Sequence, residues 1–419
     1  MLVGVSLVVF GLFALVAAVV EAGAARAAQA KLQDAVDLAA REGLRARDLA
    51  DVDPDLVRRA VASDLVRLTF DGDLDLGTAD PDLQLGAGGI VPLDDLAGVG
   101  GAGGFEPATI GRYVPAPALN AGNEGHGDLV AGTFVPGAPA GETAAYERLD
   151  FLVAGPGAAA GATAFLARAR RTTDALGLDA VPGVSTSGPP LPYLFGLGTT
   201  SQPVAGSGTA YDPRRDGITV RATAIADARP ALAASLGPDG AGLLELGSST
   251  VDGGTLAVAL DAVAWSALAA GDPLAFEASA GQLLQVGTGA VVGSVVAVAG
   301  LAEVGDVLPV TAGLAPSAAD ALASTRPRPV LLARTEAPGS VRVVALGAVD
   351  VVTADADPVA GTLTLSALRA PQTLAPDRAS LRAPGAWLAL EAGGPAEIPG
   401  LRAAFEATPG RLLAPALVR

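Results

Sequence analysis

The first twenty residues, MLVGVSLVVFGLFALVAAVV at positions 1–20, contain no charged side chain, and they decide the architecture of the chain. At about 1.5 Å per residue a helix of this length is about 30 Å long, which matches the hydrocarbon thickness of a bilayer. A cleavable secretory signal normally carries a basic region before a shorter apolar core. Because no Lys or Arg precedes this run, we predict a retained, membrane-spanning helix.

The segment that follows continues the helix as a stem. Residues 21–50 are rich in strong helix formers and contain no proline, so one helix is expected over residues 1–52. Small residues in this helix would let neighbouring helices approach closely in lipid, and an apolar face recurs at helical spacing farther along it. The residues predicted to pack helices in an assembly are Gly4, Gly11, Ala14, Ala18, Gly23, Leu32 and Val36. An ordinary single-pass anchor remains the alternative interpretation.

Charge and composition exclude several classes of partner and chemistry. The 419 residues carry a formal net charge of −17, and Lys31 is the only lysine. Binding to nucleic acid requires clustered basic residues, so we predict no nucleic-acid partner. The chain has no cysteine, which excludes disulfides, thiol catalysis and cysteine-ligated metals.

The rest of the chain is predicted to be α+β and increasingly β toward the C-terminus. Its 54 glycines and 31 prolines indicate many turns. A short surface helix is expected after Asp53-Pro54, with an apolar stripe on the side opposite Arg58, Arg59 and Arg67. A second helix is expected over residues 158–178. Strands are expected at 218–225, 255–260, 290–298, 341–346 and 361–365. Residues 286–302 are uncharged, and we interpret them as two buried strands in preference to a second membrane span.

The sequence therefore predicts three parts. They are a long N-terminal apolar α-helix or stem at 1–52, a loop-rich α+β exported domain at 53–200 and a β-rich exported domain at 201–419.

Three motifs resemble chemical sites without the context that such sites need. Residues 98–103 fit GxGxxG, but neither a strand before them nor a helix after them is predicted. Asp71, Asp73 and Asp75 have the spacing of a calcium loop, but the expected turn glycine is missing, so we interpret them as solvated acids. His126, the only histidine, is expected to be exposed in a loop. We predict no enzyme activity, no cofactor and no metal.

The order of features at the N-terminus resembles TadE/TadG-like proteins of tight-adherence, or Flp-type, pili. The stretches that carry the resemblance are the uncharged run, Val20-Glu21-Ala22-Gly23, Leu32-Gln33-Asp34-Ala35, Ala39-Ala40-Arg41-Glu42-Gly43, and two later segments at 183–196 and 218–224. The chain departs from the pilin pattern at the fifth position, where Val5 replaces the usual glutamate. The resemblance implies an apolar helix that sits in the membrane or in an assembly, and an exported remainder.

From this resemblance we expect a structural, pilin-like subunit or accessory protein of a Tad/Flp-type pilus. Its expected partners are other pilin-like subunits or copies of itself in a homo- or hetero-oligomer, and the membrane during biogenesis. The expected location is the cell surface or envelope, with the C-terminal part outside. A single-pass, membrane-anchored adhesin or binding domain is the main alternative, and an envelope enzyme with a carboxylate-lined pocket is a more distant one.

Overall fold

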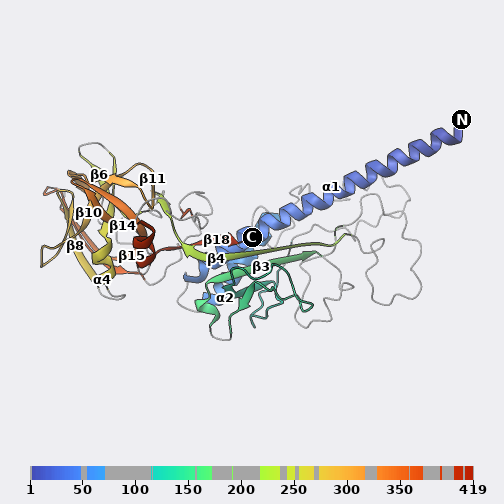
Figure 1. The fold of residues 1–419 in the computed structure, drawn as a ribbon, viewed down its shortest axis with the longest axis horizontal. Helices are drawn as coiled ribbons and strands as arrows, with labels where there is room; N and C mark the ends of the chain where they lie inside the picture. The colour runs from blue at the N-terminus through green and yellow to red at the C-terminus, as the bar shows by residue number, and fades with distance from the viewer. Residues whose placement is uncertain are drawn as a thin grey trace. The chain divides into compact units, whose positions relative to one another are not determined.

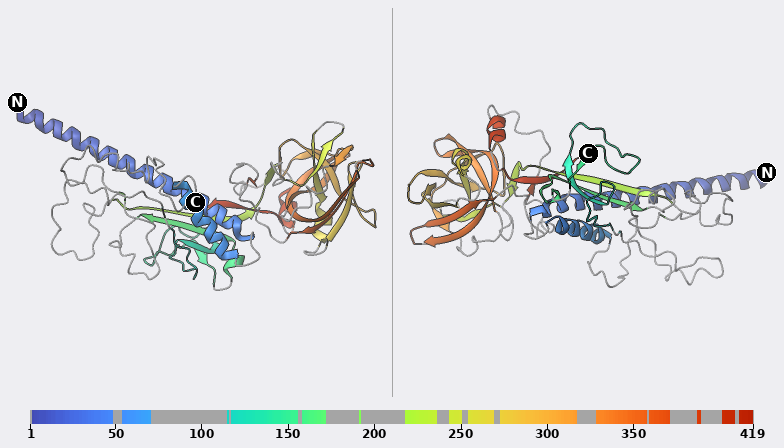
Figure 2. Two further views of the ribbon diagram at one scale, coloured as in Figure 1. Left: turned by 180° about the vertical axis from the view of Figure 1, so that it is seen from behind. Right: turned by 90° about the horizontal axis from the view of Figure 1, so that it is seen from below.

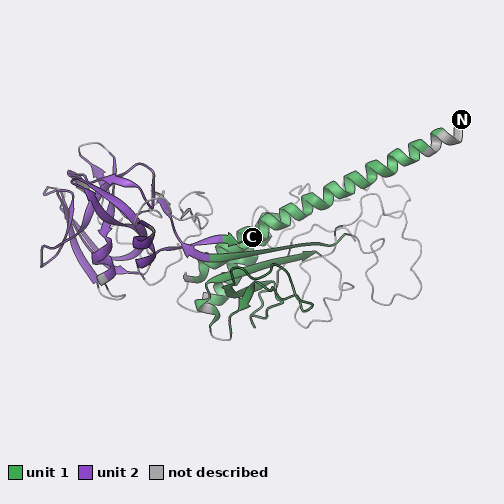
Figure 3. Cartoon of the chain, viewed as in Figure 1, with its two compact units in different colours: residues 1–227, 417–419 green, residues 228–416 purple. Residues whose placement is uncertain are grey.

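The computed structural model describes most of the chain in several stretches. The described residues are 2–48, 54–70, 115, 117–155, 158–171, 191, 218–235, 243–250, 254–268, 273–316, 328–357, 359–370, 387–388, 401–408 and 411–418. Residues 71, 73, 75 and 98–103, which carry the calcium-loop and glycine-rich motifs, lie outside this set. Two compact units divide the chain, with unit 1 at Met1–Asp227 plus Leu417–Arg419 and unit 2 at Ala228–Ala416 (Figure 3).

Unit 1 begins with the long helix that the sequence predicts. Helix α1 (Leu2–Arg45) is continuous over 44 residues, which corresponds to about 66 Å (Figure 1). The short 3-10 helix η1 (Ala46–Asp48) and helix α2 (Pro54–Phe70) follow it. Helix α2 confirms the helix expected after Asp53-Pro54, and its apolar residues Val61 and Leu65 are buried against η1.

A five-stranded sheet completes unit 1. Its strand order is β18-β4-β3-β1-β2. The strands are β1 (Leu129–Phe134), β2 (Phe151–Val153), β3 (Ala164–Arg171), β4 (Val220–Pro230) and β18 (Leu413–Val418), and the 3-10 helix η3 (Ala159–Gly161) precedes β3. Helices α1 and α2 cover one face of this sheet (Figure 2).

Small side chains let α1 lie close to the sheet. A Cβ added to Gly43 of α1 would come within 2.5 Å of a ring carbon of Phe165 on β3. The partner of Phe165 on β4 is Ala226, and the next residue on that face is Ala224. Because these residues have little or no side chain, the helix backbone can approach the strands and bury Phe165 completely.

The helix predicted over residues 158–178 is wrong. The described part of this segment forms η3 and strand β3. Ala, Leu and Arg favour a helix locally, but residues 164–171 alternate along a strand whose two faces are both buried. Phe165 and Ala167 face the helices, whereas Leu166 packs with Val130 and Ile225 in a cluster on the opposite face. Burial on both faces therefore overrides the local helix propensity.

Unit 2 is a β domain with a closed sheet. Its strand path is β10-β9-β8-β16-β15-β14-β7-β6-β13, and an additional pairing of β10 with β7 closes seven of these strands into a barrel. The barrel strands are β7 (Thr255–Asp261), β8 (Pro273–Ser279), β9 (Gln282–Gln285), β10 (Val291–Val298), β14 (Arg328–Ala337), β15 (Ser340–Asp357) and β16 (Thr362–Arg369). Strand β7 pairs in parallel with β14 and antiparallel with β10.

The remaining elements of unit 2 lie outside the barrel strands. They are β5 (Ala233–Ser235), β6 (Glu245–Ser249), α4 (Ala262–Ala267), β11 (Leu301–Glu303), β12 (Val307–Pro309), β13 (Leu314–Pro316), β17 (Trp387–Leu388) and α6 (Leu401–Ala407). Strands β11, β5 and β17 form a separate three-stranded sheet in that order. The two faces of the barrel strands pack into separate clusters: Val258 lies in one, with Trp265 of α4, and Ala257 and Ala259 lie in the other.

These observations confirm the predicted α+β class, with a long N-terminal apolar helix and a mostly β C-terminal region. All five predicted strands are present, as β4, β7, β10, β15 and β16. Residues 286–302 include β10 and the start of β11, as expected for buried strands. The predicted domain limits were 52/53 and 200/201, whereas the compact units separate at residues 227/228 and 416/417.

Candidate functional site

The exposed apolar part of helix α1 is the most distinctive surface of the described chain. Its large hydrophobic side chains are between 40% and 75% exposed, with Phe10 at 75% and Phe13 at 70%. The exposed residues are Val5, Val8, Val9, Phe10, Leu12, Phe13, Leu15, Val16, Val19 and Val20. A soluble monomer rarely exposes a contiguous apolar surface of this kind, so the segment requires an apolar environment.

This part of α1 is long and apolar enough to cross a membrane. The most apolar 18-residue window of the helix has no part buried in the rest of the chain. The uncharged run ends at Val20 and is followed by Glu21 and the exposed Arg26. Among the described residues, α1 is the one helix that meets these criteria.

The second part of α1 is fixed to unit 1. Burial of one helix face begins at Ala28 and continues through Leu32 and Val36. The Nε2 atom of Gln29 donates a hydrogen bond to the backbone oxygen of Arg221 at 2.6 Å, and Nε2 of Gln33 donates one to that of Thr223 at 3.1 Å. These side chains tie successive turns of α1 to strand β4, so the exposed segment emerges from a helix that the fold holds in place.

The predicted packing residues therefore fall into two groups. Gly11, Ala14, Ala18 and Gly23 lie on the exposed part of α1, and no atom lies within 4 Å of a Cβ placed on Gly11 or Gly23. Leu32 and Val36 are buried inside unit 1. Gly4 belongs to α1, but its surroundings lie outside the described structure.

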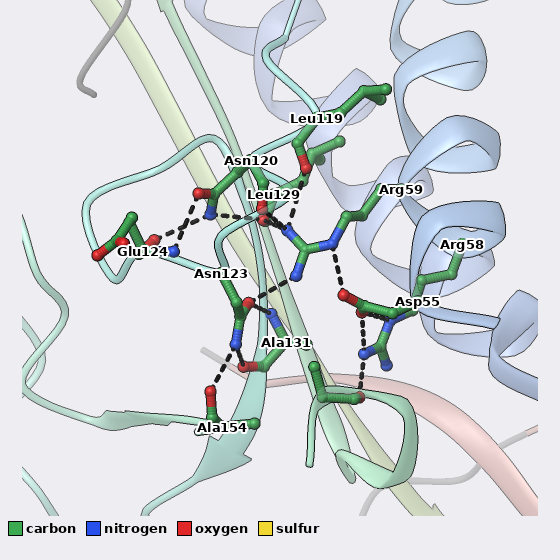
Figure 4. A network of polar contacts seen from close by, with 11 residues as sticks. Asp55, Arg58, Arg59, Leu119, Asn120, Asn123, Glu124, Leu129, Ala131 and Ala154 are labelled. Atoms are coloured by element: carbon green, nitrogen blue, oxygen red, sulfur yellow. Dashed lines mark hydrogen bonds and ion pairs between the residues drawn. The ribbon is translucent and has the colours of Figure 1, made fainter. Parts of the chain in front are cut away.

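Buried arginines connect α2 to the sheet and were missed by the sequence analysis. The sequence placed Arg58 and Arg59 on the exposed side of a surface helix, but both are fully buried. Asp55 forms ion pairs with both: its Oδ1 accepts from Arg58 and its Oδ2 accepts from Nε of Arg59 at 2.9 Å (Figure 4). Acid and base at spacings of three and four are the local signal that could have indicated this network.

Arg59 also organises the loop that leads into β1. Its guanidinium donates to the backbone oxygens of Leu119, Asn120 and Leu129, and its Nη2 donates to Oδ1 of Asn123 at 2.6 Å (Figure 4). The side-chain amide of Asn123 in turn donates to the oxygens of Ala131 and Ala154. One cation on α2 thereby satisfies carbonyl groups that are about 60 to 70 residues away in sequence.

The electrostatics of Asp55 favour its ionised form. Burial raises the pKa of the carboxyl, but the Coulomb attraction and hydrogen bonds of Arg58, together with those of Arg59, outweigh it and lower the pKa of Asp55. Burial lowers the pKa of Arg58 itself, against the attraction of Asp55.

A second buried cluster lies on the opposite face of the sheet. Arg170 of β3 pairs with Oδ1 of Asp128 at 2.8 Å, and Arg168 pairs with Glu142 at 3.2 Å. Nη1 of Arg168 also donates to the backbone oxygens of Gly125 and Gly127. Burial, reinforced by the neighbouring Arg170, lowers the pKa of Arg168 to about 10, so the guanidinium remains charged at neutral pH.

His126 lies in the loop beside this cluster, as predicted, but it is half-buried and not exposed. Its backbone oxygen accepts a hydrogen bond from Arg170 at 2.7 Å. Within the described residues, no group of three or more His, Asp or Glu side chains is arranged to hold a metal ion. The polar clusters of unit 1 thus fix helices and loops to the sheet, while the exposed part of α1 is left for contacts outside the chain.

Comparisons with protein families, curated proteins and solved structures found no match to this chain.

Proposed function

We propose that this protein is a membrane-inserted, pilin-like structural component of a Tad/Flp-type cell-surface pilus. In this proposal the exposed part of α1 packs with other pilin-like subunits or with copies of itself, and the remainder lies outside the cell. The observation that supports the proposal most directly is the uncharged, exposed segment that ends at Val20. The resemblance of the N-terminal sequence to TadE/TadG-like proteins supplies the pilus assignment.

The thermodynamic argument begins with the cost of leaving α1 in water. Burying a Val, Leu or Phe side chain contributes about 1.5–3 kcal/mol. Many such side chains are exposed between Val5 and Val20, so transfer into lipid or into a helical assembly is strongly favourable. Glu21 and Arg26 then lie where the helix would leave the apolar layer.

Helix association requires a second contribution, since lipid tails already satisfy apolar side chains. Close backbone approach at small residues supplies van der Waals contact between helices in lipid. Gly11, Ala14 and Ala18 would allow that approach because they lie on the exposed part of α1. Open space around Gly11 also means that a larger side chain there meets nothing within the chain itself.

The test is Gly11→Leu with Val9→Leu as its matched control. Both variants keep the segment apolar and uncharged, so both should insert in membranes and leave unit 1 folded. Gly11→Leu should reduce assembly at least tenfold, measured as cross-linked or sedimenting oligomer in membranes, whereas Val9→Leu should assemble like the wild type. Equal assembly by the two variants would contradict packing through the small residues.

A membrane-anchored binding protein is the second candidate, because unit 2 has its own hydrophobic clusters and accounts for a large share of the folded chain. In that case α1 would act only as a tether. Wild-type protein recovered from membranes solely as monomers would favour this candidate over the pilus proposal.

A further inference from the structure

The connectivity of the two units is that of an insertion. The chain enters unit 2 at Ala228, near the end of strand β4, and leaves it at Ala416, near the end of strand β18. Strands β4 and β18 are hydrogen-bonded neighbours in the sheet of unit 1. Unit 1 is therefore built from both ends of the chain, and unit 2 is the connection between two adjacent strands of its sheet.

The two ends of the inserted segment meet. The backbone nitrogen of Ala231 donates a hydrogen bond to the backbone oxygen of Leu412 at 2.9 Å. Residues paired in this way have Cα atoms about 5 Å apart, and an extended residue spans about 3.3–3.6 Å. A linker of two to four residues could therefore replace residues 231–412 without moving β4 or β18.

The hydrophobic clusters follow the same division. The two clusters of unit 2 draw on residues between Ala231 and Ala414. One cluster of unit 1 consists of helix residues such as Val61, and another joins sheet residues such as Leu166 to Val418 of the last strand. In the part of the chain that the structure describes, each of these clusters draws its residues from one unit.

We propose that unit 2 is an inserted domain, dispensable for the folding, membrane anchoring and assembly of unit 1. The contacts that build the oligomer are then confined to unit 1. The part of this inference that concerns assembly rests on the proposed function.

The experiment compares the full chain with a variant in which Asn-Gly replaces residues 231–412. Both carry Val16→Cys, which provides a specific cross-linking site because the chain has no cysteine of its own. Hydrogen exchange of peptides from α2 and β3 measures folding of unit 1, resistance to carbonate extraction measures anchoring, and disulfide cross-linking in membranes measures assembly. The shortened chain should match the full chain in all three, with protection and cross-linking within twofold.

A second variant covers the possibility that the shortened chain fails to fold. Trp265→Ala in the full-length protein removes the largest side chain of the unit 2 core, and it should raise hydrogen exchange within residues 228–416 only. The inference is overturned if unit 1 loses protection in this variant, or if a folded and anchored shortened chain no longer cross-links. Failure of the unshortened chain to cross-link would instead refute the proposed assembly, and the folding and anchoring results alone would then decide whether unit 2 is dispensable.

Discussion

Replacing Asp55 by alanine should strongly destabilise unit 1. Arg58 and Arg59 have no exposed surface and share this one carboxylate. Removing one partner of a buried ion pair costs about 3–5 kcal/mol, because the remaining charge is left uncompensated. Whole domains are stable by only about 5–15 kcal/mol, so this loss is a large fraction of the stability of unit 1.

The assay is urea unfolding of the full-length protein in detergent, followed by hydrogen exchange of peptides from α2 and β3. With a slope near 2 kcal/mol per molar urea, the expected loss lowers the midpoint of unit 1 by about 1.5–2.5 M. Both tryptophans, Trp265 and Trp387, lie in unit 2. Their emission should therefore report an unchanged transition of unit 2 in the same samples.

Asp64→Ala is the matched control, since Asp64 is an exposed acid on the same helix. Loss of an exposed side chain of this kind changes stability by no more than about 0.5 kcal/mol. Equal midpoints for the two variants would refute the reasoning, because they would show that the two guanidinium groups do not depend on Asp55.

Three further predictions concern single groups. Because the folded-state pKa of Asp55 is lowered, its contribution to the free energy of unfolding is complete above about pH 4 and is lost as the pH falls through that lowered value. The difference in stability between the wild type and Asp55→Asn should therefore close on acidification. A constant difference from pH 7 to pH 2 would exclude this linkage. Gly43→Ala would place Cβ 2.5 Å from the buried Phe165 ring and should lower the stability of unit 1 by about 1–3 kcal/mol. Hydrogen exchange in β3 should become faster in this variant, and it should not change in the control Gly23→Ala. Gly347→Ala would place Cβ 2.8 Å from the indole of Trp265, and should shift tryptophan emission and lower the stability of unit 2 by a similar amount, whereas an unchanged spectrum would show that the barrel accommodates the methyl group.

The elements governed by local pattern could be predicted from sequence. The uncharged run ending at Val20 and the periodicity of Val61 and Leu65 are sufficient for α1 and α2, because helix geometry relates residues three and four apart. Strands such as β10 and β15 are marked by repeated valines. The strand at residues 164–171 was missed because its Ala, Leu and Arg content favours a helix, and only the partners on its two faces make it a strand.

The buried polar network could not be predicted in the same way. The carbonyl groups that hold Arg59 come from Leu119, Asn120 and Leu129, and no pattern within α2 indicates that this loop returns to the helix. Closure of the barrel is equally non-local, since β7 pairs with β10 and β14 from different parts of the chain. In both cases the information lies in contacts between distant segments.

The two parts of helix α1 differ in how their apolar side chains are distributed around the helix. Successive residues rotate by about 100° around a helix, so residues two apart point to nearly opposite sides. Leu32 is buried and Asp34 is exposed, which is the arrangement of a helix with one protein partner. Val8 and Phe10 are both apolar and both exposed, and no single flat surface can cover two opposite sides. The apolar segment that ends at Val20 therefore needs apolar surroundings on every side, and lipid or several neighbouring helices could supply them.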